Sequence, residues 1–97
     1  MISTYSLAFQ FMETLGKKWI LPVLIFLFVY ETCTFSGIKK ELKVTSRVLS
    51  RKLRLLESLG LVERSSRSNR ASYKISDKGK RVSKSVLKLI SQEIQPS

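Results

Sequence analysis

Apolar residues recur at helical spacing near both ends of the chain. In residues 1–15 they follow Ser3 or Thr4, either of which can cap a helix, and Gly16 ends the pattern. In residues 77–97 they recur at i, i+4, i+7 and i+8. Ser76 or Asp77 can cap this second helix, and Pro96 is expected to end it. The pattern therefore predicts one amphipathic helix at each end. Their apolar residues are Leu7, Ala8, Phe11, Met12 and Leu15 in the first, and Val82, Val86, Leu89 and Ile90 in the second.

The stretch from Trp19 to Tyr30 carries no charge and is apolar almost throughout. A helix that crosses a membrane needs about 20 such residues, whereas about 10 to 14 is typical of a helix buried in a core. Pro22 lies near the start of the stretch, where a helix tolerates the missing N–H group. We predict a buried helix from about Lys18 to Tyr30, not a membrane span. We also expect core packing for the aromatic residues Phe9, Phe11, Trp19, Phe26 and Phe28.

The middle of the chain predicts two helices in succession. A short β-branched segment, 31–35, favours an extended turn or strand, and Ser36 is then expected to cap a small helix with Ile38 and Leu42 inward. A longer helix is expected between Thr45 as cap and Gly60 as stop. On an ideal helical wheel its leucines fill one side. The other side presents Ser46, Arg47, Ser50, Arg51, Arg54, Glu57 and Ser58.

Residues 61–76 predict a β-hairpin. The segments LVERSS and ASYKIS each favour a strand, with Val62, Tyr73 and Ile75 as inward side chains. Between them lies a polar tip, residues 67–70. The whole chain, 1–97, therefore reads as one domain of mainly α class with a small β-hairpin (α+β). The predicted fold is a winged helix-turn-helix, with the helix-turn-helix in 36–60, the wing in 61–76 and extra terminal helices in 1–15 and 77–97.

The charge of the chain is strongly basic and unevenly placed. Lysine and arginine number 18 against 7 aspartates and glutamates, for a net charge of +11. Residues 1–30 hold only Lys17, Lys18 and Glu13, so +10 of this charge falls in residues 31–97. A basic half joined to a nearly neutral apolar half indicates one surface for a polyanion and another for packing.

The composition argues against catalysis. The chain has no histidine, one cysteine (Cys33) and one aspartate (Asp77), which excludes Ser-His-Asp and Cys-His catalysis and leaves too few ligands for a zinc site. Its four glycines never approach the spacing of a phosphate-binding loop. We expect no enzyme, no cofactor and no metal. A lone cysteine cannot form an intramolecular disulfide and is read as an inert, half-buried thiol, so a cytoplasmic protein is expected.

These features together predict a protein that binds double-stranded DNA. A basic helix can enter the major groove, where arginine pairs with guanine and serine contacts bases or phosphates. The predicted recognition residues are Ser46, Arg47, Ser50, Arg51 and Arg54. The predicted wing contacts are Arg64, Arg67, Asn69 and Arg70, and the possible phosphate contacts are Lys39, Lys40 and Lys43. Exposed apolar stripes mark partner surfaces, so a homodimer is predicted through Leu7, Phe11, Met12, Val82, Val86, Leu89 and Ile90.

Several short motifs resemble a known family of regulators. They are Gly16, Lys18 and Trp19 before the apolar stretch, Phe35 before the small helix, then VLSRKLRLLESLGLVER and YKISDKG. In this order they resemble the HxlR family of winged-helix regulators, and more loosely the MarR family. The resemblance implies a dimeric transcription regulator held together through its terminal helices. Ser6 stands near the place where the family often has a cysteine, so redox sensing is not implied here.

Two other functions remain open from the sequence. A winged-helix module that binds only protein would usually lack the basic side of residues 46–54. A protein lying on an anionic membrane surface would have basic residues flanking its apolar helix, and only Lys17 and Lys18 do so. The sequence identifies neither the target DNA, nor the sign of regulation, nor a small-molecule effector.

Overall fold

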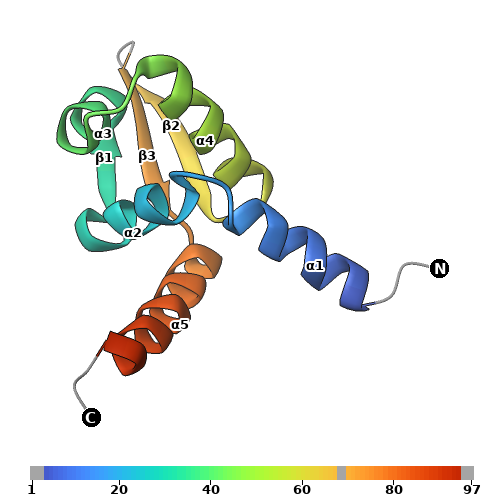
Figure 1. Ribbon diagram of the computed structural model, residues 1–97. Helices are drawn as coiled ribbons and strands as arrows, with labels where there is room; N and C mark the ends of the chain where they lie inside the picture. The colour runs from blue at the N-terminus through green and yellow to red at the C-terminus, as the bar shows by residue number, and fades with distance from the viewer. Residues whose placement is uncertain (1–3, 68–69, 95–97) are drawn as a thin grey trace.

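The structure, a computed structural model, describes residues 4–67 and 70–94 of the chain. Helices and a three-stranded antiparallel sheet of order β1-β3-β2 make up this part (Figure 1). This arrangement confirms the α+β winged-helix fold. The elements are α1 (Thr4–Leu15), α2 (Ile20–Tyr30), β1 (Thr32–Thr34), α3 (Phe35–Leu42), α4 (Ser46–Ser58), β2 (Val62–Arg67), β3 (Arg70–Ile75) and α5 (Asp77–Ile94).

Helix α2 forms the centre of the core, as its composition predicts. It packs against α4, α5 and β3, and four of its side chains are fully buried: Ile20, Val23, Leu24 and Leu27. The helix begins at Ile20, not at Lys18, because Trp19 has a left-handed backbone with φ of 73°. Its last two residues, Val29 and Tyr30, are 63% and 61% exposed. No helix in the described residues is long and apolar enough to cross a membrane.

Side-chain caps fix the start of both helices of the helix-turn-helix. The Thr45 hydroxyl accepts a hydrogen bond of 3.2 Å from the Val48 N–H, as predicted for α4. For α3 the predicted cap, Ser36, is wrong, because the helix begins at Phe35 and Ser36 lies inside it. Thr34 is the cap, and its hydroxyl accepts from the Gly37 N–H at 3.1 Å. After α4, Gly60 takes the left-handed φ of 73° that the stop requires.

The wing is a two-stranded extension of the sheet. Its strands reach Arg67 and Arg70, which pair with each other, so each strand is one residue longer than predicted at the tip. The predicted inward residues Val62, Tyr73 and Ile75 are all buried. Strand β1 pairs along the other edge of β3, which brings the N-terminus of α3 beside the wing.

The terminal helices project from the compact centre of the molecule (Figure 1). The Ser76 hydroxyl caps α5 by accepting from the Gly79 N–H at 3.0 Å. The helix ends at Ile94, and Pro96, the predicted end, lies outside the described residues. The prediction that Phe9 packs in the core is wrong: its side chain is 52% exposed, because it lies on the side of α1 opposite Phe11 and Leu15. Of the other aromatic residues, Phe11, Trp19, Phe26 and Phe28 all pack against the core.

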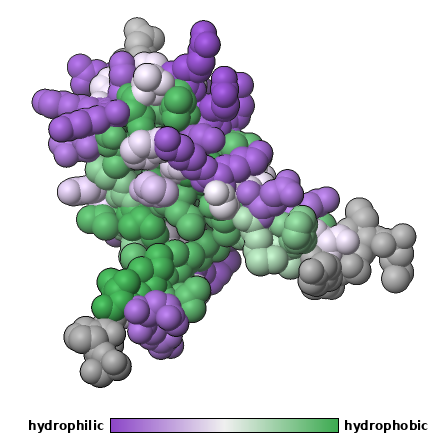
Figure 2. All heavy atoms as spheres, viewed as in Figure 1, coloured by the Kyte–Doolittle hydropathy of each residue, from purple (hydrophilic) through white to green (hydrophobic). Residues whose placement is uncertain are grey.

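Polar and apolar surfaces lie at opposite ends of the molecule. Hydrophilic residues gather over the wing, α3 and α4, whereas hydrophobic residues gather over α2 and along α5 (Figure 2). The exposed apolar residues of the terminal helices are Leu7, Phe9, Met12, Leu87, Leu89, Ile90 and Ile94. The fold therefore separates a basic end from an apolar end.

Candidate nucleic-acid interface

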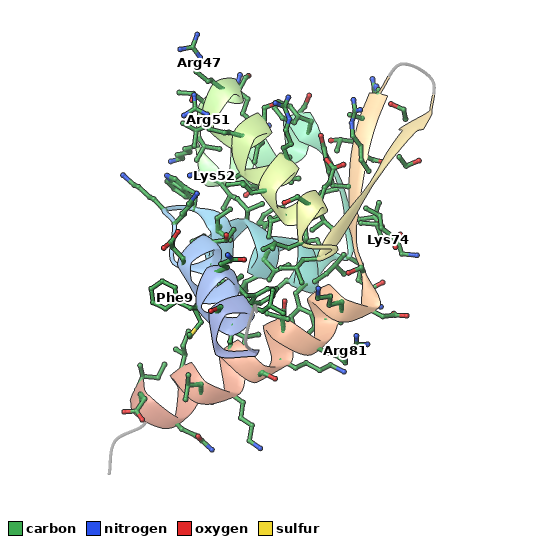
Figure 3. The ribbon with its side chains drawn as sticks, turned by 90° about the vertical axis from the view of Figure 1, so that its right-hand side faces the viewer. Phe9, Arg47, Arg51, Lys52, Lys74 and Arg81 are labelled. Carbon is green, nitrogen blue, oxygen red and sulfur yellow. The ribbon has the colours of Figure 1, made fainter. Side chains whose placement is uncertain are left out.

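Burial of its leucines fixes the side of α4 that faces solvent. Leu49, Leu53 and Leu56 are fully buried, so the opposite side of the helix must point outward. All the predicted recognition residues are exposed, and together they line a shallow groove of about 390 Å³. Arg47 and Arg51 project from the end of the molecule that lies away from α5 (Figure 3). The groove is lined by Ser46, Arg47, Ser50, Arg51 and Arg54.

A larger groove of about 540 Å³ lies between α4 and the wing. Arg64 and Arg70 reach it from the wing, and Ser50 reaches it from α4. A neighbouring hollow of about 260 Å³ joins Arg54 to Arg64. The structure thus brings two predicted wing residues and the predicted recognition helix onto one concave surface. The side chains of the other two predicted wing residues, Arg67 and Asn69, lie outside the described residues.

Sequence reasoning missed one side of this groove. Thr34, Phe35 and Ser36, at the start of α3, line it together with Ala71 and Tyr73 of β3. Their presence follows from the pairing of β1 with β3, in which Thr34 lies opposite Ser72. No spacing of residues in the sequence predicts the pairing of these two strands. The groove therefore has hydroxyl groups and the N–H groups of a helix N-terminus as hydrogen-bond donors, in addition to its two arginines.

The lysines within and just after α3 stand apart from these grooves. Lys39, Lys40 and Lys43 are all exposed, but none of them lines the hollows beside α4. Lys40 instead borders a separate hollow of about 360 Å³ with Tyr30 and Cys33. The three lysines therefore add charge around the basic end without joining its concave surface.

Among the described residues, the basic side chains of the interface form no ion pairs within the protein, although Glu57 lines one hollow with Arg54 and Arg64. In residues 6–66 and 70–94, no aspartate or glutamate forms an ion pair with a lysine or arginine. Cations that are not neutralised within the protein raise the positive potential at this end and favour a polyanionic ligand. The sequence already contains this surplus charge, but the absence of internal pairing is a property of the fold.

In the described residues the possible metal ligands do not cluster, and the single cysteine has a raised thiol pKa. Across the part of the chain that the structure describes, histidine, cysteine, aspartate and glutamate form no group of three or more that could hold a metal ion. Cys33 is a free, half-buried cysteine, and burial raises the pKa of its thiol. Because the thiolate is the reactive form, a raised pKa makes this cysteine a poor nucleophile, in line with the inert thiol expected.

Comparison with known proteins agrees with this geometry. The model of a family described as HxlR-like helix-turn-helix matches residues 14–95. A transcriptional regulator homologue from Pyrococcus horikoshii OT3 is 30% identical over 87% of this chain and 90% of that chain, with a TM-score of 0.74. No curated protein sequence matches the chain significantly.

MarR from E. coli is a second structural relative. A mutant of that protein is 26% identical over 84% of this chain and 65% of that chain, with a TM-score of 0.75. The same mutant complexed with operator DNA is 25% identical over 87% and 63%, with a TM-score of 0.73. These neighbours are winged-helix transcriptional regulators. Because the family model matches most of the chain, the protein belongs to the HxlR-like helix-turn-helix family.

Proposed function

We propose that the protein is a transcription regulator that binds specific sites in double-stranded DNA as a homodimer. The observation that carries the proposal is the exposed side of α4, where three arginines and two serines line one groove and make no ion pair among the described residues. The major groove of B-DNA is about 12 Å wide and admits one helix. In this arrangement α4 is the recognition helix, and Arg47, Arg51 and Arg54 read bases or phosphates.

The wing supplies the second part of the interface. Arg64 and Arg70 share the groove with Ser50, so DNA held against α4 passes the wing as well. Phosphate contacts orient a protein on the duplex without reading sequence. We assign this role to Arg64 and Arg70, to Arg67 and Asn69 at the tip, and to Lys39, Lys40 and Lys43 around it. The relative crystallised with operator DNA, MarR, supports a DNA role for this surface by analogy of fold.

Self-association would cover the exposed apolar residues of α1 and α5. Met12 is 57% exposed, Leu89 is 62% exposed and Ile90 is 46% exposed, a pattern that is costly for an isolated domain in water. Phe11, Val82 and Val86 are half-buried beside them, and Leu7 is exposed further along α1. A two-fold dimer that covers these residues sets two recognition helices about 34 Å apart, one turn of DNA.

The DNA proposal is tested with two variants that lose the same charge. The first replaces Arg47, Arg51 and Arg54 with alanine. The matched control replaces Arg81, Lys84 and Lys88 with alanine. These three cations are exposed on α5, and Arg81 lies far from Arg47 in Figure 3. Duplexes are first selected from a random pool with the wild-type chain, and affinities are then measured by fluorescence anisotropy at fixed salt.

The two variants should behave differently toward the selected duplex. Each bidentate base contact contributes about 1–3 kcal/mol of discrimination, so the first variant should lose its preference for the selected duplex over a scrambled one. The control should keep that preference, with at most a uniform loss of affinity. Equal loss of preference in both variants would show that α4 does not read sequence.

The assembly proposal is tested by one apolar substitution and its control. Leu89→Lys places a charge in the proposed interface, whereas Gln92→Lys places the same charge at an exposed polar position one turn on. The chain has a mass of 11.1 kDa, so sedimentation equilibrium at micromolar concentration separates monomer from dimer. We expect a dimer for the wild type and the control and a monomer for Leu89→Lys. A wild-type mass near 11.1 kDa across that range would rule out the dimer.

A further inference from the structure

The turn that follows the recognition helix is held by the start of α5. Three successive carbonyl groups of that turn accept hydrogen bonds from residues 76 and 78. The Leu59 carbonyl accepts from Lys78 Nζ at 2.9 Å, the Gly60 carbonyl from Ser76 Oγ at 2.6 Å and the Leu61 carbonyl from the Ser76 N–H at 3.0 Å. Carbonyl groups at a helix end have no partner within the helix. Ser76, the residue before α5, supplies two of these partners and Lys78 of α5 supplies the third, so the turn after α4 and the start of α5 meet in a joint.

Close packing makes the joint stiff. Gly79, in the first turn of α5, lies directly against the backbone of Leu61, and a Cβ atom at position 79 would overlap the Leu61 carbonyl. Gly60 holds its left-handed φ of 73° opposite the Lys78 side chain. Packed backbones shift between discrete arrangements and do not deform smoothly. Gly79 therefore ties the start of α5 closely to the turn that follows α4.

Lys78 also contacts the other terminal helix. Its ammonium group lies 5.4 Å from the centre of the Phe11 ring on α1. The partial negative charge at the C-terminus of α4 and the face of an aromatic ring both attract a cation. Among the residues that the structure describes, Lys78 is the one lysine whose ammonium group donates a hydrogen bond to the protein. The other lysines of α5 lack such a position.

From these contacts we infer that Lys78 is a positioning residue that couples the arrangement of α1 and α5 to the recognition helix. The link runs from Phe11 through the Lys78 ammonium group to the Leu59 carbonyl. Arg54 lies in the next turn back along α4, so the link ends close to the DNA surface. Dimer formation, or any ligand that moves the terminal helices, then changes DNA affinity. This inference rests on the proposed function.

A double-mutant cycle tests the link. Lys78→Met removes the ammonium group and keeps a long apolar side chain, and Phe11→Leu removes the ring and keeps an apolar contact. Couplings between sites commonly change affinity by about 5- to 150-fold, so each single variant should bind the selected duplex at least about fivefold more weakly. The double variant should be no weaker than Lys78→Met alone, because both substitutions break one link. Lys78→Arg, which keeps the cation, should restore most of the affinity.

Matched controls separate this link from general effects. Lys84→Met removes an exposed lysine from the same helix, and Phe9→Leu removes an exposed ring from α1, on the left in Figure 3. Both controls should bind DNA as the wild type does, within about twofold. Additive losses in the double variant, or equal losses in the controls, would overturn the coupling.

Amide hydrogen exchange tests the same link without DNA. It can be measured in the Phe11→Leu variant even if Lys78→Met fails to fold. The N–H groups of Leu59, Gly60 and Leu61 bond to carbonyls in the last turns of α4 and report opening of the joint. Phe11→Leu should speed their exchange, because the ring helps to hold the Lys78 ammonium group that bonds to the Leu59 carbonyl. Unchanged exchange there would refute the link. If the wild type binds no duplex at all, the proposed function fails, while the exchange measurement still decides the coupling.

Discussion

Replacing Gly79 with alanine should destabilise the protein, although alanine is the better helix former. In an open helix, alanine is favoured over glycine by about 1 kcal/mol. At position 79, however, the added methyl group would lie 2.7 Å from Ile75 Cγ1 and 3.1 Å from the Leu61 carbonyl carbon, and closer still to the Leu61 oxygen. Such distances are well inside van der Waals contact.

The size of the effect depends on whether the neighbours can move. The Ile75 side chain is 1% exposed, and Leu61 is held by the hydrogen bond from the Ser76 N–H to its carbonyl, so neither can yield cheaply. Overpacking of this kind costs about 1–3 kcal/mol and occasionally more. Because neither neighbour can yield, the cost here should lie in the upper part of that range, at about 2–3 kcal/mol. After the gain of about 1 kcal/mol in helix propensity, we expect a net loss of about 1–2 kcal/mol. For a domain of this size that is a fall in Tm of roughly 5–15 °C.

Thermal unfolding followed by circular dichroism measures this loss, with Gly37→Ala as control. Gly37 also lies in a helix, but its nearest neighbour is the Thr34 hydroxyl oxygen at 3.1 Å, a side-chain atom and not a backbone group. The control should therefore lose less stability than Gly79→Ala. A Tm for Gly79→Ala equal to or above that of the wild type would contradict the close contact between α5 and the turn after α4.

Other substitutions test the remaining features of the structure. Thr45→Ala removes the cap of α4 and should lower the free energy of unfolding by about 1 kcal/mol, measured by urea titration, whereas Ser46→Ala, one residue on, should cost less. Arg64→Ala and Arg70→Ala should each flatten the slope of log K against log salt by about 0.9, if each side chain contacts one phosphate, and an unchanged slope would refute that contact. Cys33 should react with iodoacetamide more slowly than free cysteine at pH 8, because burial raises its thiol pKa, and the rate should climb as the pH rises.

The sequence by itself determined the features that depend on residues close together in the chain. Thr45 and Gly60 mark the ends of α4 because a cap and a stop act within one helical turn. The leucines of α4 predict the side that is buried because helical periodicity is a local property, and Leu49, Leu53 and Leu56 are fully buried. In the same way, alternation along the hairpin predicts the burial of Tyr73 and Ile75.

Tertiary structure decided the features that join distant segments. The cap of α3 is Thr34 and not Ser36, because the pairing of β1 with β3 ends the strand at Thr34 and lets the helix begin at Phe35. That pairing also places the start of α3 in the groove beside the wing, which no spacing in the sequence predicts. Whether two elements pair is set by packing across the whole domain, and competing pairings look alike locally.

The contacts of Lys78 illustrate the same limit. In the sequence it is one of many lysines, and its distances in the chain from Leu59 and Phe11 follow no repeating pattern. It contacts both only because Gly79 allows α5 to approach the turn after α4 and α1 lies beside that joint. Local sequence fixes which residues form each helix and which side of the helix is apolar. The relative placement of helices depends on the summed packing of many side chains, and only the folded structure reveals it.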